Sequence, residues 1–217
     1  MKMNDSESLK LKERFEKVCE SRFNVWFLNS IDPLLFGKAV RVMPLKKNSK
    51  VIELGCGTGW ASRRMAKIAI EGEVVGIDLL ESMIETAKQF TAKDKSRNYE
   101  NLSFMVADAE SIPYPDNYFD YAISITSFSW WRNPDRGLEE IERILKPDGQ
   151  FYAVDVCKER RVDNLMVRPE RYADYDYKEN LYSRREYREL FEKKFENVYQ
   201  KNFSIIWALL TVGTKKR

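Results

Sequence analysis

The sequence predicts an α/β fold, a doubly wound and mostly parallel sheet, and three observations lead to that prediction. Segments typical of strands and helices alternate between residues 50 and 156. The first predicted strand runs into a glycine-rich turn, and a segment of helix-forming composition follows it. Near the C-terminus, residues 195–203 and 205–213 alternate in polarity and predict an antiparallel strand pair. A chain of 217 residues suits one large domain.

The composition restricts both the partners and the chemistry of the chain. The net charge of +3 is small against 37 basic and 34 acidic residues, which predicts no nucleic-acid or membrane partner. The chain has no histidine, which excludes Ser-His-Asp and Cys-His catalysis and any His-ligated zinc site, and we expect no metal. Three scattered cysteines and a charged N-terminus predict a cytoplasmic protein. No apolar run approaches the ~20 residues that span a bilayer.

The first 44 residues are predicted to form a helical cap, part of the same domain as residues 45–217. Apolar side chains recur at three- and four-residue steps from Leu9 to Asn29, and Pro33 begins a second helical stretch that continues to Met43. Helices of this kind usually cover one face of a core. A lid over a ligand site is the alternative.

The glycine-rich run Glu53-Leu54-Gly55-Cys56-Gly57-Thr58-Gly59 directly follows the strand that begins at Val51. Glycine allows positive φ and lets a ligand lie against the backbone. A dinucleotide fingerprint needs a third glycine where this chain has Trp60. The carboxylate of Glu53 would repel a pyrophosphate but attract an ammonium group. The run therefore favours a ligand with an α-amino group over NAD, and a glycine-rich turn without a ligand is the remaining alternative.

Acidic residues end the next two predicted strands. Residues 73–78 read as a buried strand that ends at Asp78, before a helix over residues 81–93. Asp108 follows a third strand over residues 102–107. In nucleotide-binding folds, an acid that ends the second strand accepts hydrogen bonds from the two ribose hydroxyls. Taken singly, either acid could instead cap a helix or turn.

The second half of the chain continues the alternation of strands and helices. A proline-rich loop over residues 112–120 leads into a strand over 121–125, and a helix over 135–145 ends in Leu-Lys-Pro-Asp-Gly before a strand over 150–156. A further helix is predicted over 183–194. Trp130 and Trp131 follow the fourth strand, where paired tryptophans either pack in the core or hold an apolar or cationic acceptor.

Together these motifs resemble those of the class I S-adenosylmethionine-dependent methyltransferases, in the small-molecule branch that includes quinone-biosynthesis enzymes. The glycine-rich run resembles motif I of that family. The proline-rich loop and the Leu-Lys-Pro-Asp-Gly run match two further family patterns. The resemblance implies a Rossmann-like sheet of seven strands with an antiparallel C-terminal pair, and S-adenosyl-L-methionine as the cofactor.

The resemblance also implies the residues that contact the cofactor. The glycine-rich run would wrap the methionine part and Asp78 would hold the ribose. Leu79, and less directly Met83, would lie against the adenine, and Asp108 would accept from its amino group while Ala109 addresses the ring. The complete set of expected contacts is Glu53, Gly55, Cys56, Gly57, Asp78, Leu79, Met83, Asp108, Ala109 and Ser124.

The expected activity is direct in-line methyl transfer to a small-molecule acceptor, with residues 157–182 shaping the acceptor pocket. Asp155, Tyr172 and Tyr175 are candidates for a base, but no pattern selects one, so catalysis is unassigned. An RNA or protein methyltransferase is one alternative, although residues 124–127 lack the Asn/Asp-Pro-Pro motif of enzymes that methylate base amino groups. A non-catalytic cofactor-binding protein is the other. A homodimer is compatible with the sequence.

Overall fold

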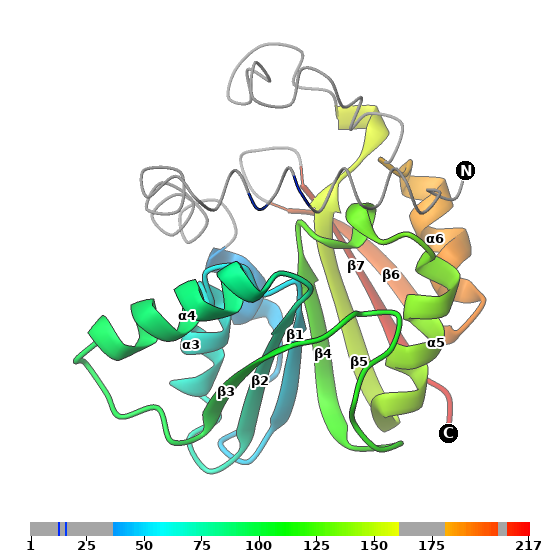
Figure 1. Ribbon diagram of the computed structural model, residues 1–217. Coiled ribbons are helices and arrows are strands. Elements are labelled where there is room, and N and C mark those ends of the chain that lie inside the picture. The colour runs from blue at the N-terminus through cyan, green and yellow to red at the C-terminus, as the bar shows by residue number, and fades with distance from the viewer. Residues whose placement is uncertain (1–12, 14–15, 17–36, 161–180, 204–207) are drawn as a thin grey trace.

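The computed structural model describes residues 13, 16, 37–160, 181–203 and 208–217 (Figure 1). Within them, seven strands form one sheet in the order β3-β2-β1-β4-β5-β7-β6. The strands are β1 (Lys50–Leu54), β2 (Glu73–Asp78), β3 (Leu102–Val106), β4 (Phe119–Ile125), β5 (Leu145–Val156), β6 (Phe195–Phe203) and β7 (Ala208–Lys215). The helices are α3 (Trp60–Ala66), α4 (Glu81–Lys93), α5 (Pro134–Ile144) and α6 (Arg184–Glu192), with two 3-10 turns, η1 (Phe128–Trp130) and η2 (Lys158–Arg160).

The predicted fold class is confirmed. Strands β1 to β5 pair in parallel, and β7 runs antiparallel between β5 and β6. Strand β4 begins two residues earlier than predicted, because Phe119 pairs with Leu145. The sequence places Leu145 at the end of the predicted helix over residues 135–145. Of the predicted N-terminal cap, residues 37–42 are helical, and the stretch from Leu9 to Asn29 lies outside the described residues.

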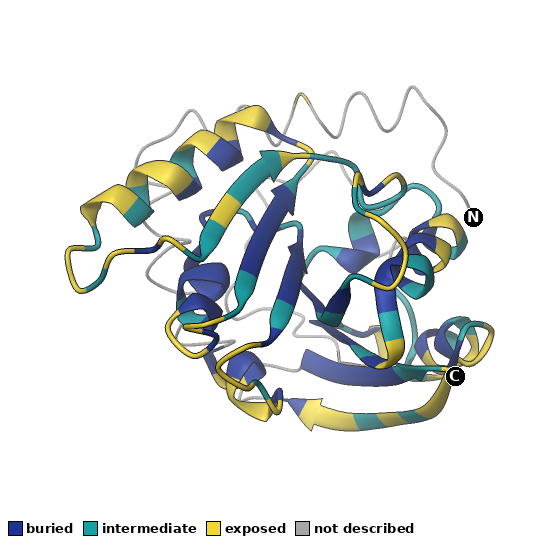
Figure 2. Ribbon diagram, turned by 90° about the horizontal axis from the view of Figure 1, so that it is seen from below, coloured by how far each residue is buried: buried dark blue, intermediate teal, exposed yellow. Residues whose placement is uncertain are grey.

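Helices cover both faces of the sheet (Figure 1). Residues 37–42, α3 and α4 lie on one face, where Val40 and Met65 belong to the first core cluster. On the other face, α5 and α6 contribute Ile141 and Phe191 to the second cluster. Viewed from below, the central strands are buried, and much of the edge strand β6 is exposed (Figure 2). No helix in the described part of the chain is long and apolar enough to span a membrane.

The capping residues of α5 and α6 explain where these two helices begin. At α5, the Asn133 side chain accepts from the Arg136 N–H, and Pro134 occupies the first turn, where its missing N–H costs nothing. At α6, Ser183 and Glu186 form a reciprocal capping box. Both helices therefore begin at residues whose side chains satisfy otherwise unpaired N–H groups.

The register of the parallel strands gathers their loops at one edge. Leu54 pairs with Ile77 and with Ser124, and Ile77 pairs with Met105. The residues that follow β1, β2, β3 and β4 consequently leave the sheet side by side. In open α/β sheets this carboxyl edge is where ligands bind.

Candidate functional site

Two glycines of the loop after β1 serve different purposes. Gly55 and Gly57 both have positive φ, 68° and 51°. A Cβ added at Gly55 would stand 2.4 Å from the Cβ of Ser127, so the protein itself fills that space. A Cβ added at Gly57 would meet no atom of the described residues within 4 Å. Gly57 therefore presents bare backbone to open space, the surface that a closely packed ligand needs.

Asp78 ties this loop to the end of β2. Its Oδ2 accepts from the Gly57 N–H at 2.9 Å, and its Oδ1 accepts from the Leu80 N–H at 3.0 Å. Burial raises the pKa of Asp78, and the two N–H groups offset part of that rise. Each carboxylate oxygen keeps one further acceptor position, which leaves room for a second donor on either oxygen.

Glu53 lies beneath the loop at the end of β1. It is 2% exposed, and its Oε2 accepts a hydrogen bond from the Ser62 hydroxyl in α3. Burial raises the pKa of Glu53 to about 8, although the Ser62 hydrogen bond and the nearby Arg63 act in the opposite direction. At neutral pH the carboxyl group therefore carries a proton, which a nearby cation would displace.

The loop after β3 carries Asp108. Its Oδ1 accepts from the Glu110 N–H at 2.9 Å, and its Oδ2 accepts from the Arg132 guanidinium at 2.8 Å. Ala109 lies between Asp108 and Glu110 in the turn that the hydrogen bond from the Glu110 N–H to Asp108 closes. Asp108 thus stands at the predicted edge of the sheet, and it has an ionic partner, Arg132, that the sequence did not indicate.

The remaining predicted contacts divide into exposed and buried side chains. Leu79 is 44% exposed, so its apolar side chain is accessible to a ligand. Met83 and Cys56 are 6% and 3% exposed and belong to the core. Ser124 is fully buried, and its hydroxyl lies 2.9 Å from that of Ser127. The roles predicted for these four residues stay predictions.

Sequence reasoning missed the segment between β4 and η1. Thr126 has a φ of 54°, a rare value for a β-branched residue. The Ser127 hydroxyl donates to the Leu54 carbonyl at 2.8 Å and so joins this segment to the end of β1. The Thr58 hydroxyl in the glycine loop is buried without a hydrogen-bond partner among the described residues. No local sequence pattern marks these positions, because each depends on the approach of two separate loops.

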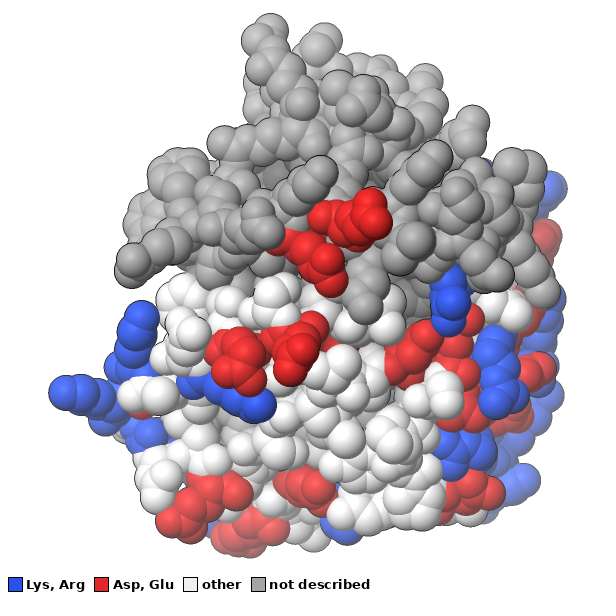
Figure 3. Space-filling view, in the orientation of Figure 1, with Lys and Arg blue, Asp and Glu red and all other residues white. Residues whose placement is uncertain are grey.

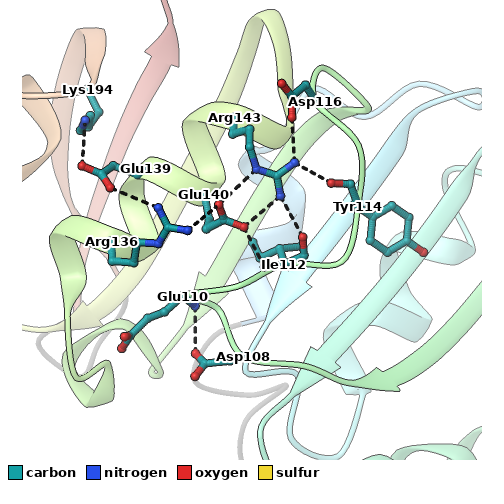
Figure 4. Close-up of polar contacts among 10 residues, drawn as sticks. All are labelled: Asp108, Glu110, Ile112, Tyr114, Asp116, Arg136, Glu139, Glu140, Arg143 and Lys194. Carbon is teal, nitrogen blue, oxygen red and sulfur yellow. Dashed lines mark hydrogen bonds and ion pairs between the residues drawn. The ribbon is translucent and has the colours of Figure 1, made fainter.

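An ionic cluster on α5 holds the loop that follows Asp108 (Figure 4). The carboxylate of Glu140, which is 6% exposed, accepts from the Ile112 N–H at 2.8 Å. Arg143 donates to the carbonyls of Ile112 and Tyr114 at 2.8 and 2.6 Å and to Asp116 at 2.9 Å. The hydrogen bonds from Arg143 also lower the pKa of Glu140. Helix α5 therefore fixes the backbone between β3 and β4.

Of the three candidate bases, the structure describes only Asp155, since Tyr172 and Tyr175 lie outside the described residues. Asp155 is 3% exposed and accepts from the N–H groups of Ser129 and Val156 at 3.0 and 2.9 Å. Burial raises its pKa to about 6. Asp155 supports η1 in this arrangement, and its role as a base stays a prediction.

The two tryptophans after β4 differ in their surroundings. Trp131 packs against Phe128 with ring centroids 4.7 Å apart and stacks on Phe151, so its partly buried ring packs against the second core cluster. Trp130 ends η1 and is half-buried. For Trp131, the packing alternative is therefore the one that the structure bears out.

The surface charges give no sign of a nucleic-acid interface on the face seen in Figure 3. Lysines and arginines lie among aspartates and glutamates over α5 and α6. Pairs such as Lys193 with Asp135 and Lys194 with Glu139 account for this mixture. Within the described ranges, no three potential ligand residues gather in a way that would hold a metal ion.

Comparison with known proteins finds one family and many related folds. A family model described as "Methyltransferase domain" matches residues 45–202. The demethylmenaquinone methyltransferase of Staphylococcus aureus strain JH9 is 34% identical over 141 residues, which cover 64% of this chain and 54% of that protein. The chain thus matches about half the length of this relative.

Two solved structures share the fold. One belongs to the complex between the Haloferax volcanii Trm112 methyltransferase activator and a putative methyltransferase, with a TM-score of 0.73, 23% identity, and coverage of 90% of this chain and 95% of that one. The other is a SAM dependent methyltransferase from Aquifex aeolicus, with a TM-score of 0.72, 21% identity, and coverage of 90% and 98%.

Proposed function

The chain belongs to the class I S-adenosylmethionine-dependent methyltransferases, and from this premise we propose that it transfers a methyl group from S-adenosyl-L-methionine to a small-molecule acceptor. The observation that carries the proposal is the open space over Gly57. It lies beside Asp78, the acid that ends the neighbouring strand. The positive φ of Gly57 alone would explain a glycine, so it is the open space beside an acid with free acceptor positions that supports a ligand.

The described residues fit this cofactor in charge and shape. Glu53 and Asp78 are acids near the loop, which suits a ligand that carries an ammonium group and a ribose but no phosphate. Leu79 offers an exposed apolar side chain next to Asp78. We propose that Asp78 holds the ribose hydroxyls, Leu79 contacts the adenine, and Asp108 accepts from the adenine amino group.

The proposed mechanism needs little chemistry from the protein. The cofactor supplies a methyl group that its sulfonium already activates. The glycine loop, the acid that ends β2 and the acid on the loop after β3 would fix the donor at the carboxyl edge, so that an acceptor approaches in line and water is excluded. The fully buried groups Ser124 and Asp155 would hold the loop after β4 in place.

We propose an aromatic or quinone-like acceptor. The support comes from the relative named demethylmenaquinone methyltransferase, whose matched region includes much of this chain. We further propose that residues 1–44 form a cap on the domain of residues 45–217, and that residues 157–182 shape the acceptor pocket. A reducing, cytoplasmic location is supported by Cys56, a free and buried thiol in the described part of the chain.

Parallel calorimetric titrations with S-adenosylmethionine, S-adenosylhomocysteine and NAD test the proposal. We expect micromolar binding of the two adenosyl ligands and none of NAD. Methyl transfer to members of a quinone and phenol panel would then identify the acceptor class. Binding without turnover on any acceptor, including RNA and protein extracts, would favour a non-catalytic protein. A folded sample that binds neither adenosyl ligand would contradict the proposal.

The affinity for S-adenosylmethionine should rise with pH up to about 8, the pKa of Glu53 in the free protein. A cation bound near Glu53 favours its carboxylate, so binding releases a proton below that pH. The affinity is therefore expected to fall by up to about tenfold for each unit of acidification between about pH 8 and 6. Calorimetry in buffers of different ionisation enthalpy measures the proton release.

Glu53→Gln is the matched control, because it keeps the shape and removes the titration. The ligand's own amino group titrates near pH 8 with either protein, so only the difference between the proteins reports on Glu53. The free energy of unfolding of the ligand-free wild type should also fall as pH rises from 4.5 towards about 8, since the folded chain keeps a proton that the unfolded chain loses. If the affinity of wild type and that of Glu53→Gln changed with pH in the same way, the assignment of Glu53 to the ligand's ammonium group would be refuted.

A further inference from the structure

Arg132 reaches from the loop after β4 to two acids on the loop after β3. Its Nη2 donates to Asp108 Oδ2 at 2.8 Å and lies 3.7 Å from Glu110 Oε2. Strands β3 and β4 are not neighbours in the sheet, because β2 and β1 lie between them. This ion pair therefore joins two loops that the sheet alone does not hold together.

The backbone on both sides of Arg132 is fixed. The preceding Trp131 ring packs against Phe128. The following Asn133 donates its N–H to Glu110 Oε1 at 2.8 Å and caps α5 with its side chain. The Cα of Arg132 is therefore held close to the loop after β3, which places Asp108 and Glu110 within reach of its side chain.

Arg132 in turn fixes the orientation of Asp108. One carboxylate oxygen accepts from the Glu110 N–H at 2.9 Å and the other from Arg132 at 2.8 Å. With a donor on each oxygen, the carboxylate plane cannot rotate freely, and one acceptor position on each oxygen remains. The Asp108 side chain is still 28% exposed. Its remaining acceptor positions are therefore accessible.

We propose that Arg132 is a positioning residue that makes the site specific for adenine over a 6-oxopurine. It holds Asp108 so that the free acceptor positions meet the amino group of adenine. A 6-oxopurine would present an oxygen acceptor to a carboxylate that has no donor. The inference rests on the proposed function, in which Asp108 receives the adenine amino group.

The test compares two ligands that differ only in the base, S-adenosylhomocysteine and S-inosylhomocysteine. Wild type should prefer the adenosyl ligand by about 10- to 100-fold, as expected for a hydrogen bond to a charged group. Arg132→Met keeps the aliphatic stem, and its preference should be about tenfold smaller, mainly through weaker binding of the adenosyl ligand. Arg132→Lys, which restores the charge but not the planar fork, should recover part of the preference.

Arg185→Met on α6 is the matched control. The Arg185 side chain is 83% exposed and pairs with Glu189 one turn away, so the ligand preference should stay at the wild-type value. Thermal unfolding of each variant reports on stability separately, and a loss of stability alone would not change the ratio of the two affinities. The preference is thus a readout that a purely structural role for Arg132 would leave unaltered.

The outcomes separate the inference from the proposed function. Wild type that binds neither ligand would overturn both. Wild type that binds both equally would overturn the adenine contact of Asp108 and the inference with it. If wild type prefers the adenosyl ligand and Arg132→Met retains the full preference, or binds that ligand more tightly, the inference alone fails. Tighter binding would mean that Arg132 competes with the ligand for Asp108.

Discussion

Replacing Asp78 with alanine is expected to lower the affinity for S-adenosylmethionine by at least about a hundredfold, since two hydrogen bonds to a carboxylate contribute about 1.5–3 kcal/mol each. The side chain has two tasks in the proposed site. It would receive the ribose hydroxyls, and it already accepts from the N–H groups of Gly57 and Leu80. Removing it therefore takes away a ligand contact and releases the loop that shapes the site. Calorimetry measures the affinity, and circular dichroism confirms the fold.

A ligand that lacks one ribose hydroxyl separates the two tasks of Asp78. The 2′-deoxy analogue of S-adenosylhomocysteine lacks one hydroxyl that Asp78 would receive. If Asp78 contacts the ribose, Asp78→Ala should lose less affinity for the deoxy analogue than for the parent ligand. Asp135→Ala, which removes a half-exposed acid from α5, serves as the control and should bind normally. An equal loss for both ligands would limit Asp78 to anchoring the loop, and unchanged affinity would refute the assignment.

Local patterns were enough to predict most elements of the fold. The bounds predicted for the strand over residues 73–78 and the helix over 81–93 are those observed, because the strand is a short apolar run that ends in an acid and the helix follows it directly. The start of β4 was predicted too late, since it depends on the pairing of Phe119 with Leu145, which are far apart in the sequence. Contacts of this kind are set by the sheet, and local propensity does not encode them.

In the candidate site, too, local patterns predict some residues, and contacts between distant segments determine the others. Residues that end strands, such as Asp78 and Asp108, were predicted because parallel strands bring their carboxyl ends together. The contacts of Ser127 beneath Gly55, and of Arg132 with Asp108, were not predicted. Each requires two loops to meet, and their side chains form no motif along the chain. The sequence thus predicts which residues would face the ligand, whereas the structure adds contacts that hold Asp108 and Gly55 in position.

Gly57→Asn is expected to weaken cofactor binding while the chain stays folded. Asparagine tolerates positive φ, and its side chain would enter space in which the described part of the chain has no atom within 4 Å of the added Cβ. We therefore expect a loss of stability below about 1 kcal/mol. The affinity for S-adenosylmethionine should fall by about 10- to 100-fold, because forcing a side chain into space that the ligand fills costs about 1–3 kcal/mol. Chemical denaturation and calorimetry on the same samples measure the two effects.

The same substitution at Gly55 should have the opposite pattern of effects. There the added Cβ would stand 2.4 Å from Ser127, and the backbone φ is 68°. Overpacking against Ser127 should reduce the free energy of unfolding by about 1–3 kcal/mol. Gly55 and Gly57, which have one residue between them, would then have different roles. The fold needs Gly55, and the ligand needs Gly57. Full cofactor affinity in folded Gly57→Asn would show that the open space over Gly57 is not the cofactor site.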